Sequence, residues 1–227
     1  MTTRLVFHYL ISVVLLLMVG LQVTVASADE SANEATKVKA TKQGWQPMVK
    51  HWRAVDFGGD GPVTIEPTLL TLGYGDPMTG IRWNQPFPKQ NFEVRMEARR
   101  TDGNDFFCGL TFPVGDGSCS LILGGWGGGV VGLSSIDGAD ASENPTSDYK
   151  QFHNDQWYKI RVRVDHQQIQ CWVDEKSIVK QERGDHEFEV RFEMDPTLPI
   201  GLANYQCESE FRKLEFRRIP EGEIKAK

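Results

Sequence analysis

Three stretches of this chain alternate almost strictly between apolar and charged residues, and this pattern limits the possible folds more than any other feature. Residues 92–99 read FEVRMEAR, residues 157–164 read WYKIRVRV, and residues 187–194 read EFEVRFEM. Successive side chains of a β-strand point to opposite faces, so a period of two over eight residues predicts a half-buried strand. We therefore expect three strands with apolar side chains inward and charged side chains outward.

Other short apolar segments extend this pattern along the chain. Candidate strands occur at VTIEP, LLTLGY, FFCGLTF, CSLILGG, GVVGLSSI, IQCWVD, SIVKQER and EFRKLEFRRI. Turn signals separate many of them, including Asp-Gly or Asp-Pro pairs that begin at residues 60, 76, 102, 116 and 137. We find no convincing 3.6-residue periodicity after the N-terminal apolar run. The sequence therefore predicts an all-β fold, with a two-sheet antiparallel sandwich favoured over a closed barrel.

The N-terminus has the pattern of a secretory signal. Arg4 precedes the apolar run LISVVLLLMVGL, and VASA ends at Ala28 in the small-x-small form that signal peptidases accept. Cleavage after Ala28 would give a secreted or periplasmic protein with no membrane span in the mature chain; the alternative is an uncleaved membrane anchor. We expect a signal peptide (1–28), a flexible lead-in (29–44), one β-sandwich domain (45–220) and a C-terminal tail (221–227).

Charge and cysteine content restrict the partners. The formal net charge is −6 and no basic run is present, which argues against nucleic acid as a partner. The chain has four cysteines, which could form disulfides in three possible pairings or remain buried free thiols: Cys108, Cys119, Cys171 and Cys207. The sequence does not decide between these alternatives.

We expect no cofactor, although calcium binding by one acidic loop is possible from its sequence. The chain has no CxxC or HExxH spacing, so a transition-metal site is not expected. The loop 137–148 contains four carboxylates that could ligate calcium, although their spacing differs from an EF-hand and acidic loops commonly serve solubility: Asp137, Asp140, Glu143 and Asp148.

Three longer stretches resemble a known family. They are NFEVRMEARRTDGNDFFCGLTF (91–112), NDQWYKIRVRVDHQQIQCWVDEKSIV (154–179) and LPIGLANYQCESEFRKLEFRRI (198–219). In order and content they resemble the 3-keto-disaccharide hydrolase domains of the concanavalin A-like lectin/glucanase superfamily, over about residues 45–219. The resemblance implies a jelly-roll sandwich that acts on carbohydrate.

The resemblance also implies candidate catalytic residues. It implies cleavage of 3-keto-glycosides, with Glu97 or Asp105 as the acid/base. The chain departs from the family at three positions: Asp105 replaces the Ser of a Gly-Asn-Ser-Gly strand, and Ala203 and Tyr205 stand where Gln and His often follow Pro-Ile-Gly-Leu. The Glu-x-Asp-x-x-Glu string of the secreted glucanases is also absent. A non-catalytic carbohydrate-binding or adhesion module is therefore the competing hypothesis.

The residues themselves suggest how a sugar could be held. On the charged face of residues 92–99, Arg95 could hydrogen-bond hydroxyl groups, with Arg161 assisting from a neighbouring strand. Trp172 lies on the polar face of its strand, and Trp126 stands among glycines in GGWGGG, so both could stack on a sugar ring. The alternatives are a solvated charged face and tryptophans packed under loops. A carbohydrate ligand is the expected partner.

Overall fold

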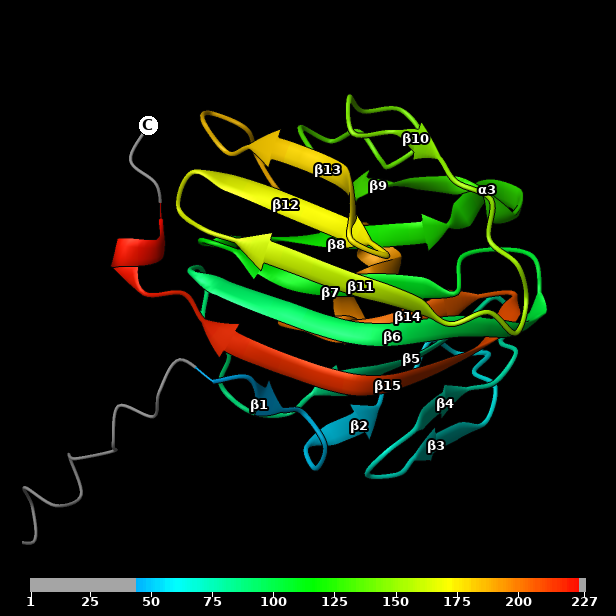
Figure 1. Ribbon diagram of the computed structural model, residues 1–227. Helices are drawn as coiled ribbons and strands as arrows, with labels where there is room; N and C mark the ends of the chain where they lie inside the picture. The colour runs from blue at the N-terminus through cyan, green and yellow to red at the C-terminus, as the bar shows by residue number, and fades with distance from the viewer. Residues whose placement is uncertain (1–43, 225–227) are drawn as a thin grey trace, which may run out of the picture. The chain divides into compact units, whose positions relative to one another are not determined.

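The computed structural model of the chain describes residues 44–224, which form two antiparallel β-sheets packed face to face (Figure 1). Sheet A has eight strands in the order β13-β12-β11-β6-β15-β4-β3, with β1 also paired to β15. Sheet B has seven strands in the order β10-β9-β8-β7-β14-β5-β2. This arrangement confirms the predicted all-β, two-sheet antiparallel jelly-roll sandwich.

Most of the predicted strands are present, and the sheets contain further strands that the sequence did not predict. Sheet A contains β1 (Gln46–Pro47), β3 (Val63–Ile65), β4 (Leu70–Leu72), β6 (Phe92–Gly103), β11 (Tyr158–Val164), β12 (Gln168–Val173), β13 (Lys176–Glu182) and β15 (Cys207–Arg218). Sheet B contains β2 (Trp52–Ala54), β5 (Met78–Trp83), β7 (Cys108–Val114), β8 (Gly117–Gly124), β9 (Val130–Ser134), β10 (Asp148–Tyr149) and β14 (Gly201–Tyr205). The helical segments are α3 (Gly125–Gly128), η1 (Phe192–Thr197) and η2 (Glu221–Glu223).

The core lies between the two sheets and is built by the alternating pattern. On β6 the inward side chains Phe92, Val94 and Ala98 are 0–2% exposed, and they join one large apolar cluster with inward residues of β7, β8, β11 and β12. Because β6 lies between β11 and β15, its outward side chains face the outer surface of sheet A between two rows of neighbours. The same strand therefore supplies both the core and the first candidate site.

The prediction of a strand at residues 187–194 is wrong. Only one isolated bridge, between Ile136 and Phe188, involves this segment, which then turns into the 3-10 helix η1. The Phe192 side chain, predicted to point inward, is 77% exposed. Residues 187–189 do form backbone hydrogen bonds with residues 135–137, but this pairing ends before Arg191, where the chain turns into η1. An alternating pattern records which side chains share a face, but it does not show how far the backbone pairing continues.

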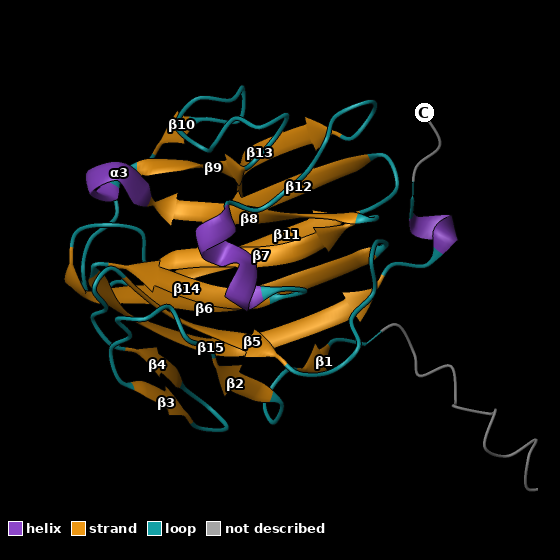
Figure 2. Cartoon of the chain, turned by 180° about the vertical axis from the view of Figure 1, so that it is seen from behind, coloured by secondary structure: helices purple, strands orange, loops and turns teal. Residues whose placement is uncertain are grey.

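The segment containing η1 covers part of the outer face of sheet B, as the view from behind shows (Figure 2). A second, smaller apolar cluster fills the space beneath it, with Met78 of β5, Met194 of η1 and Ala203 of β14 at its centre. Phe106 and Tyr205 pack against this cluster from the strand ends. The outer face of sheet B is therefore partly apolar.

Some sequence predictions concern residues outside this description. The signal peptide and nearly all of the lead-in lie outside residues 44–224. Within that range, no helix is long and apolar enough to cross a membrane. All four cysteines are buried free thiols, so the structure contains none of the three disulfide pairings that the sequence left open.

Candidate functional site

Two hollows lie on opposite outer faces of the sandwich, and the residues singled out from the sequence divide between them. Hollow A has a volume of about 550 Å³ and is lined by side chains of sheet A: Trp45, Glu93, Arg95, Met96, Glu97, Lys159, Ile160, Arg161, Trp172, Glu175, Lys213, Glu215 and Arg217. Hollow B, of about 300 Å³, is lined from sheet B, η1 and two turns: Met78, Asp105, Phe106, Ser120, Ile122, Trp126, Ser134, Arg191, Glu193, Met194 and Tyr205.

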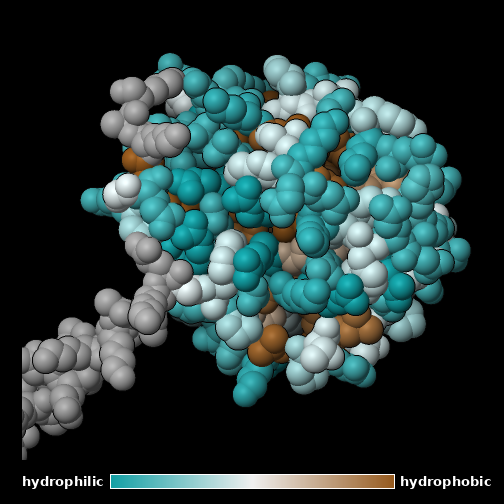
Figure 3. Space-filling model, in the orientation of Figure 1, coloured by the Kyte–Doolittle hydropathy of each residue, from teal (hydrophilic) through white to brown (hydrophobic). Residues whose placement is uncertain are grey.

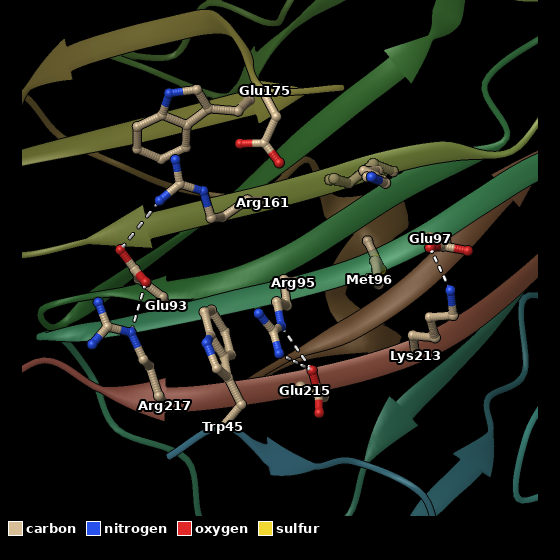
Figure 4. Close-up of a pocket in the computed structure, with 13 residues that line it drawn as sticks. Trp45, Glu93, Arg95, Met96, Glu97, Arg161, Glu175, Lys213, Glu215 and Arg217 are labelled. Atoms are coloured by element: carbon tan, nitrogen blue, oxygen red, sulfur yellow. Dashed lines mark hydrogen bonds and ion pairs between the residues drawn. The ribbon is translucent and has the colours of Figure 1, made fainter. Parts of the chain in front are cut away.

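A row of ion pairs between neighbouring strands of sheet A, here called the sheet A ladder, lines hollow A. Strand pairing places Glu93, Arg95 and Glu97 of β6 between cross-strand neighbours on β11 and β15, and these neighbours include arginine, lysine and glutamate. Figure 4 shows the resulting row of contacts along β6. The outer face of sheet A is mostly hydrophilic around it (Figure 3).

The two carboxylates on β6, Glu93 and Glu97, are buried rather than solvated, which corrects the expectation of a water-facing charged strand. Glu93 is only 2% exposed and lies 2.8 Å from Arg217 Nε, 3.3 Å from Arg163 Nη1 and 3.7 Å from Arg161 Nη1. The long arginine side chains cover it, because three cations converge on one carboxylate.

Glu97 is held in the ionised state by two cations. A bulge in β15, with Lys213 at φ 55°, directs two consecutive residues to the same carboxylate: Arg212 Nε lies 2.7 Å from Oε2 and Lys213 Nζ lies 2.8 Å from Oε1. Burial alone would raise the pKa of Glu97, but the hydrogen bonds from Lys213 and Arg212 outweigh it and hold that pKa below the usual 4.5. A carboxylate in this state is a poor proton donor at neutral pH.

The tryptophans of sheet A are already stacked on guanidinium groups. Arg161 lies 3.8 Å from the ring centre of its cross-strand partner Trp172, and Arg95 lies 4.1 Å from the ring centre of Trp45. A guanidinium occupies the ring face that a sugar would need. Arg95 is also paired with Glu215 at 2.6 Å. The four predicted residues therefore share one hollow, but each is already bound by another side chain of the protein: Arg95, Glu97, Arg161 and Trp172.

The lowered pKa of Glu97 predicts how stability depends on pH. Its contribution to stability is present above the unfolded pKa near 4.5 and is lost as the pH falls through the lower folded pKa. We expect Glu97→Gln to lower the melting temperature at pH 7, and this loss to shrink toward pH 3. Thermal unfolding across that range measures it, with Glu66→Gln on an exposed side chain as the matched control. An equal deficit at pH 3 and pH 7 would contradict the ion-pair explanation.

In hollow B, a hydrogen bond joins the turn that carries Asp105 to the turn that carries Trp126. Asp105 Oδ1 accepts from Phe106 N at 2.7 Å, and Oδ2 accepts from Gly127 N at 3.1 Å. Trp126 adopts the left-handed conformation, with φ 48° and ψ 54°, which L-residues rarely take, and its side chain is 47% exposed. In the described part of the chain, no arginine or lysine lies over its ring.

The Asp105 turn is fixed from below by a buried arginine. Arg100 is 5% exposed and donates from Nη1 to Asp105 O at 3.0 Å, from Nη2 to Phe152 O at 3.2 Å and from Nε to Asn154 Oδ1 at 2.6 Å. The Arg100 guanidinium thus donates to carbonyl and amide oxygens and not to the carboxylate of Asp105, which can make other contacts. Among residues 44–224, no cation forms an ion pair with Asp105.

Arg191 supplies the positive charge of hollow B. Its Nη2 lies 3.0 Å from Glu193 Oε1 and its Nη1 lies 2.9 Å from Asp140 Oδ2. The hydrogen bond from Arg191 holds the pKa of Glu193 below its usual value, and the bond to Glu193 raises the pKa of Arg191. Sequence analysis assigned Arg191 to a strand at 187–194 and did not single it out as a site residue. Only its position in the fold identifies it as part of hollow B.

Two carboxylates of the acidic loop 137–148 are bound by side chains of the protein. Asp140 binds Arg191, and Asp137 Oδ2 lies 2.7 Å from His186 Nδ1. Within residues 44–224, no cluster of three or more histidine, cysteine, aspartate or glutamate side chains is suited to a metal ion. Calcium binding by this loop stays an untested expectation.

Sequence comparison identifies the family. Residues 39–217 match the family described as the 3-keto-alpha-glucoside-1,2-lyase-like domain. The chain belongs to this family. The match agrees with the resemblance to 3-keto-disaccharide hydrolases seen in the sequence. No curated protein matches the chain.

Solved structures share the fold of this family member at low sequence identity. The Crh5 transglycosylase in complex with NAG is 10% identical, with a TM-score of 0.52 over 78% of this chain and 84% of its own. An endo-acting O-glycanase of the human gut microbiota is 12% identical, with a TM-score of 0.50 over 79% and 97%. The alginate lyase AlgAT5 is 9% identical, with a TM-score of 0.50 over 76% and 96%. These similarities establish the sandwich fold alone.

The positions at which this chain departs from the family fall at hollow B. Asp105 and Tyr205 line it, and Ala203 lies in the apolar cluster at its edge. The ring of Tyr205 lies 5.7 Å from that of Phe106, and Tyr205 N donates to Phe106 O at 3.0 Å. The structure thus brings Asp105 and Trp126 together and places Glu97 on the opposite face. Sequence analysis missed the remaining polar lining of hollow B: Ser120, Ser134, Arg191 and Glu193.

Proposed function

We propose that this domain binds carbohydrate in hollow B and that its substrates are 3-keto-glycosides. One observation carries the proposal: among residues 44–224, no cation lies over the ring of Trp126 and none forms an ion pair with Asp105, and both side chains line hollow B. An exposed ring accepts the C–H face of a pyranose, and polar groups around it fix the orientation of the sugar. Hollow A has similar residue types, but they neutralise and cover one another.

The family description names a 1,2-lyase of 3-keto-glucosides, and that reaction can be written from elementary chemistry. The C3 ketone acidifies the proton on C2, and a base removes that proton. The electron pair of the C2–H bond forms a C1=C2 double bond while the C1–O bond breaks. The departing oxygen takes up a proton, so the products are an unsaturated keto sugar and a free alcohol, and no water is consumed.

Asp105 is suited to be the base. Of the two carboxylates that line hollow B, Glu193 is bound to Arg191, whereas Asp105 is fixed only by backbone N–H groups among residues 44–224. Arg191 would stabilise negative charge that develops on the ketone oxygen when C2 loses its proton. Trp126 would hold the sugar ring.

A non-catalytic carbohydrate-binding module is the second candidate function, and one observation argues against hydrolysis of ordinary glycosides in hollow B. Hydrolysis of an unoxidised glycoside needs a carboxylic acid that protonates the leaving oxygen, usually with a second carboxylate. Glu193 has a lowered pKa and is held ionised by Arg191, so it cannot supply that proton at neutral pH. This favours either elimination, which begins with a base, or a non-catalytic carbohydrate-binding module.

Incubation of the full chain with a 3-keto-disaccharide tests the proposal and separates the two functions. Elimination would produce a conjugated enone, which absorbs in the near ultraviolet, together with the free alcohol. Retention of the 3-keto-disaccharide or of polysaccharides on an array without turnover would support the binding module. Absence of both would overturn the carbohydrate function.

We expect Trp126→Ala to weaken binding of a 3-keto-disaccharide by roughly 10- to 30-fold, about 1.4–2 kcal/mol, because it removes an exposed aromatic ring on which a sugar can stack. Isothermal titration measures the change. Trp172→Ala is the matched control, since it removes the same side chain from hollow A. A larger loss with Trp172→Ala than with Trp126→Ala would place the ligand on the other sheet.

The site of action outside the cytoplasm is part of the same proposal. It rests on the N-terminal pattern that ends at Ala28. N-terminal sequencing of protein recovered from the periplasm or the culture medium should begin at Asp29. Recovery of a chain that still contains the apolar run would instead indicate an anchored form.

A further inference from the structure

Two serines form the floor of hollow B, and neither belongs to the machinery described above. Ser120 of β8 and Ser134 of β9 are cross-strand partners, and each is only 1% exposed. Cross-strand partners carry their Cβ atoms about 4.5–5.5 Å apart on the same face of the sheet. Both residues line the hollow, so two hydroxyl-bearing side chains lie on adjacent strands at its wall.

Ser134 has a buried hydroxyl without a partner. Among residues 44–224, no group forms a hydrogen bond with Ser134 Oγ. A buried polar group left unpaired destabilises a protein, so such groups are rare and call for a physical reason. A hydroxyl that lines a ligand hollow has one: it can donate its proton to an oxygen of the ligand.

Ser120 has the opposite character, because its proton is used by the protein. Thr197 Oγ1 donates to Met194 O at 2.6 Å, and a carbonyl oxygen can only accept. Each hydroxyl has one proton, so the 2.7 Å contact between Thr197 and Thr111 takes its proton from Thr111. The 2.9 Å contact between Thr111 and Ser120 then takes its proton from Ser120. This leaves Ser120 Oγ, on a residue that lines the hollow, with a lone pair that can accept a further hydrogen bond.

We propose that Ser134 and Ser120 together recognise a sugar that carries a ketone next to a hydroxyl group. Ser134 donates to the ketone oxygen, which can only accept, and Ser120 accepts the proton of the neighbouring hydroxyl. This inference rests on the proposed function and deepens it, since it assigns the preference for keto sugars over unoxidised ones to a donor and an acceptor on adjacent strands. An unoxidised sugar places a hydroxyl group at this position, and its proton needs an acceptor that a ketone does not require.

The test compares a 3-keto-disaccharide with its unoxidised parent, using binding by the full chain and its Ser134→Ala variant. We expect the ratio of the two affinities to fall about tenfold in Ser134→Ala, equivalent to about 1.4 kcal/mol. We expect the melting temperature to stay the same or rise, because the hydroxyl has no protein partner to lose. Ser118→Ala is the matched control: it lies on the same face of β8, outside the hollow, and should change neither quantity.

The outcomes separate this inference from the proposed function. If Trp126→Ala weakens binding while Ser134→Ala leaves the ratio intact, the recognition role of Ser134 is overturned and the site stands. If neither variant affects binding, both are overturned. A lower melting temperature in Ser134→Ala, with an unchanged ratio, would show that the hydroxyl serves the fold.

Discussion

Asp105→Asn should lower the rate of elimination from a 3-keto-glycoside by roughly 10²- to 10⁴-fold, the range that a general base contributes. The amide keeps an acceptor oxygen for the shorter bond from Phe106 N and loses the acceptor for Gly127 N. The loss then comes from the missing base. Measurement of the turnover number at saturating substrate isolates this effect from binding.

Glu97→Gln is the control that decides between the two faces of the sandwich. The resemblance to the family implied Glu97 or Asp105 as the acid/base, and the structure places them in different hollows. We expect Glu97→Gln to retain nearly full turnover under conditions in which it remains folded. Loss of turnover in Glu97→Gln, with activity kept in Asp105→Asn, would return the reaction to hollow A.

Glu93→Ala should produce the largest loss of stability, about 3 kcal/mol in the free energy of unfolding. Removal of one partner from a buried ion pair typically costs 3–5 kcal/mol because the remaining charge is left uncompensated. Here the arginines stay partly accessible to water, with side-chain exposures of 15% for Arg163, 17% for Arg217 and 35% for Arg161, which favours the lower end. Urea unfolding monitored by tryptophan fluorescence measures the change.

Glu215→Ala is the matched control for Glu93→Ala. Glu215 also pairs with an arginine of the sheet A ladder, but its side chain is 29% exposed and that of Arg95 is 45% exposed. Pairs at such exposure contribute about 0–1 kcal/mol. A Glu93→Ala variant no less stable than Glu215→Ala would show that burial of Glu93 has no energetic consequence.

The sandwich could be predicted from the sequence because the alternation of apolar and polar residues in a strand depends only on consecutive residues. At 92–99 and 157–164 the alternation indicated correctly which side chains enter the core. At 187–194 an equally clear pattern misled, because backbone pairing stops after Glu189 and Phe192 begins the 3-10 helix η1, where its side chain is exposed. The physical difference lies in the backbone: a strand extends only as far as another segment offers its hydrogen-bonding groups.

The candidate site was only half accessible to sequence reasoning. Trp126 stood out because it lies among glycines, and Asp105 because it departs from a family motif. Arg191 and the serine pair gave no signal of their own. In contrast, two residues predicted to bind a sugar already have partners in the protein. Arg95 forms an ion pair with Glu215, and Arg161 lies over the ring of Trp172.

The sequence by itself determined which side chains of each strand face inward, since a period of two is a property of consecutive residues. It also determined the family. Only the tertiary structure decided which outward charges neutralise one another and which remain free for a ligand, because Glu93 and Arg217, or Asp105 and Gly127, meet across strands and turns far apart in the chain. Such pairing depends on which strands become neighbours, and no local pattern encodes it.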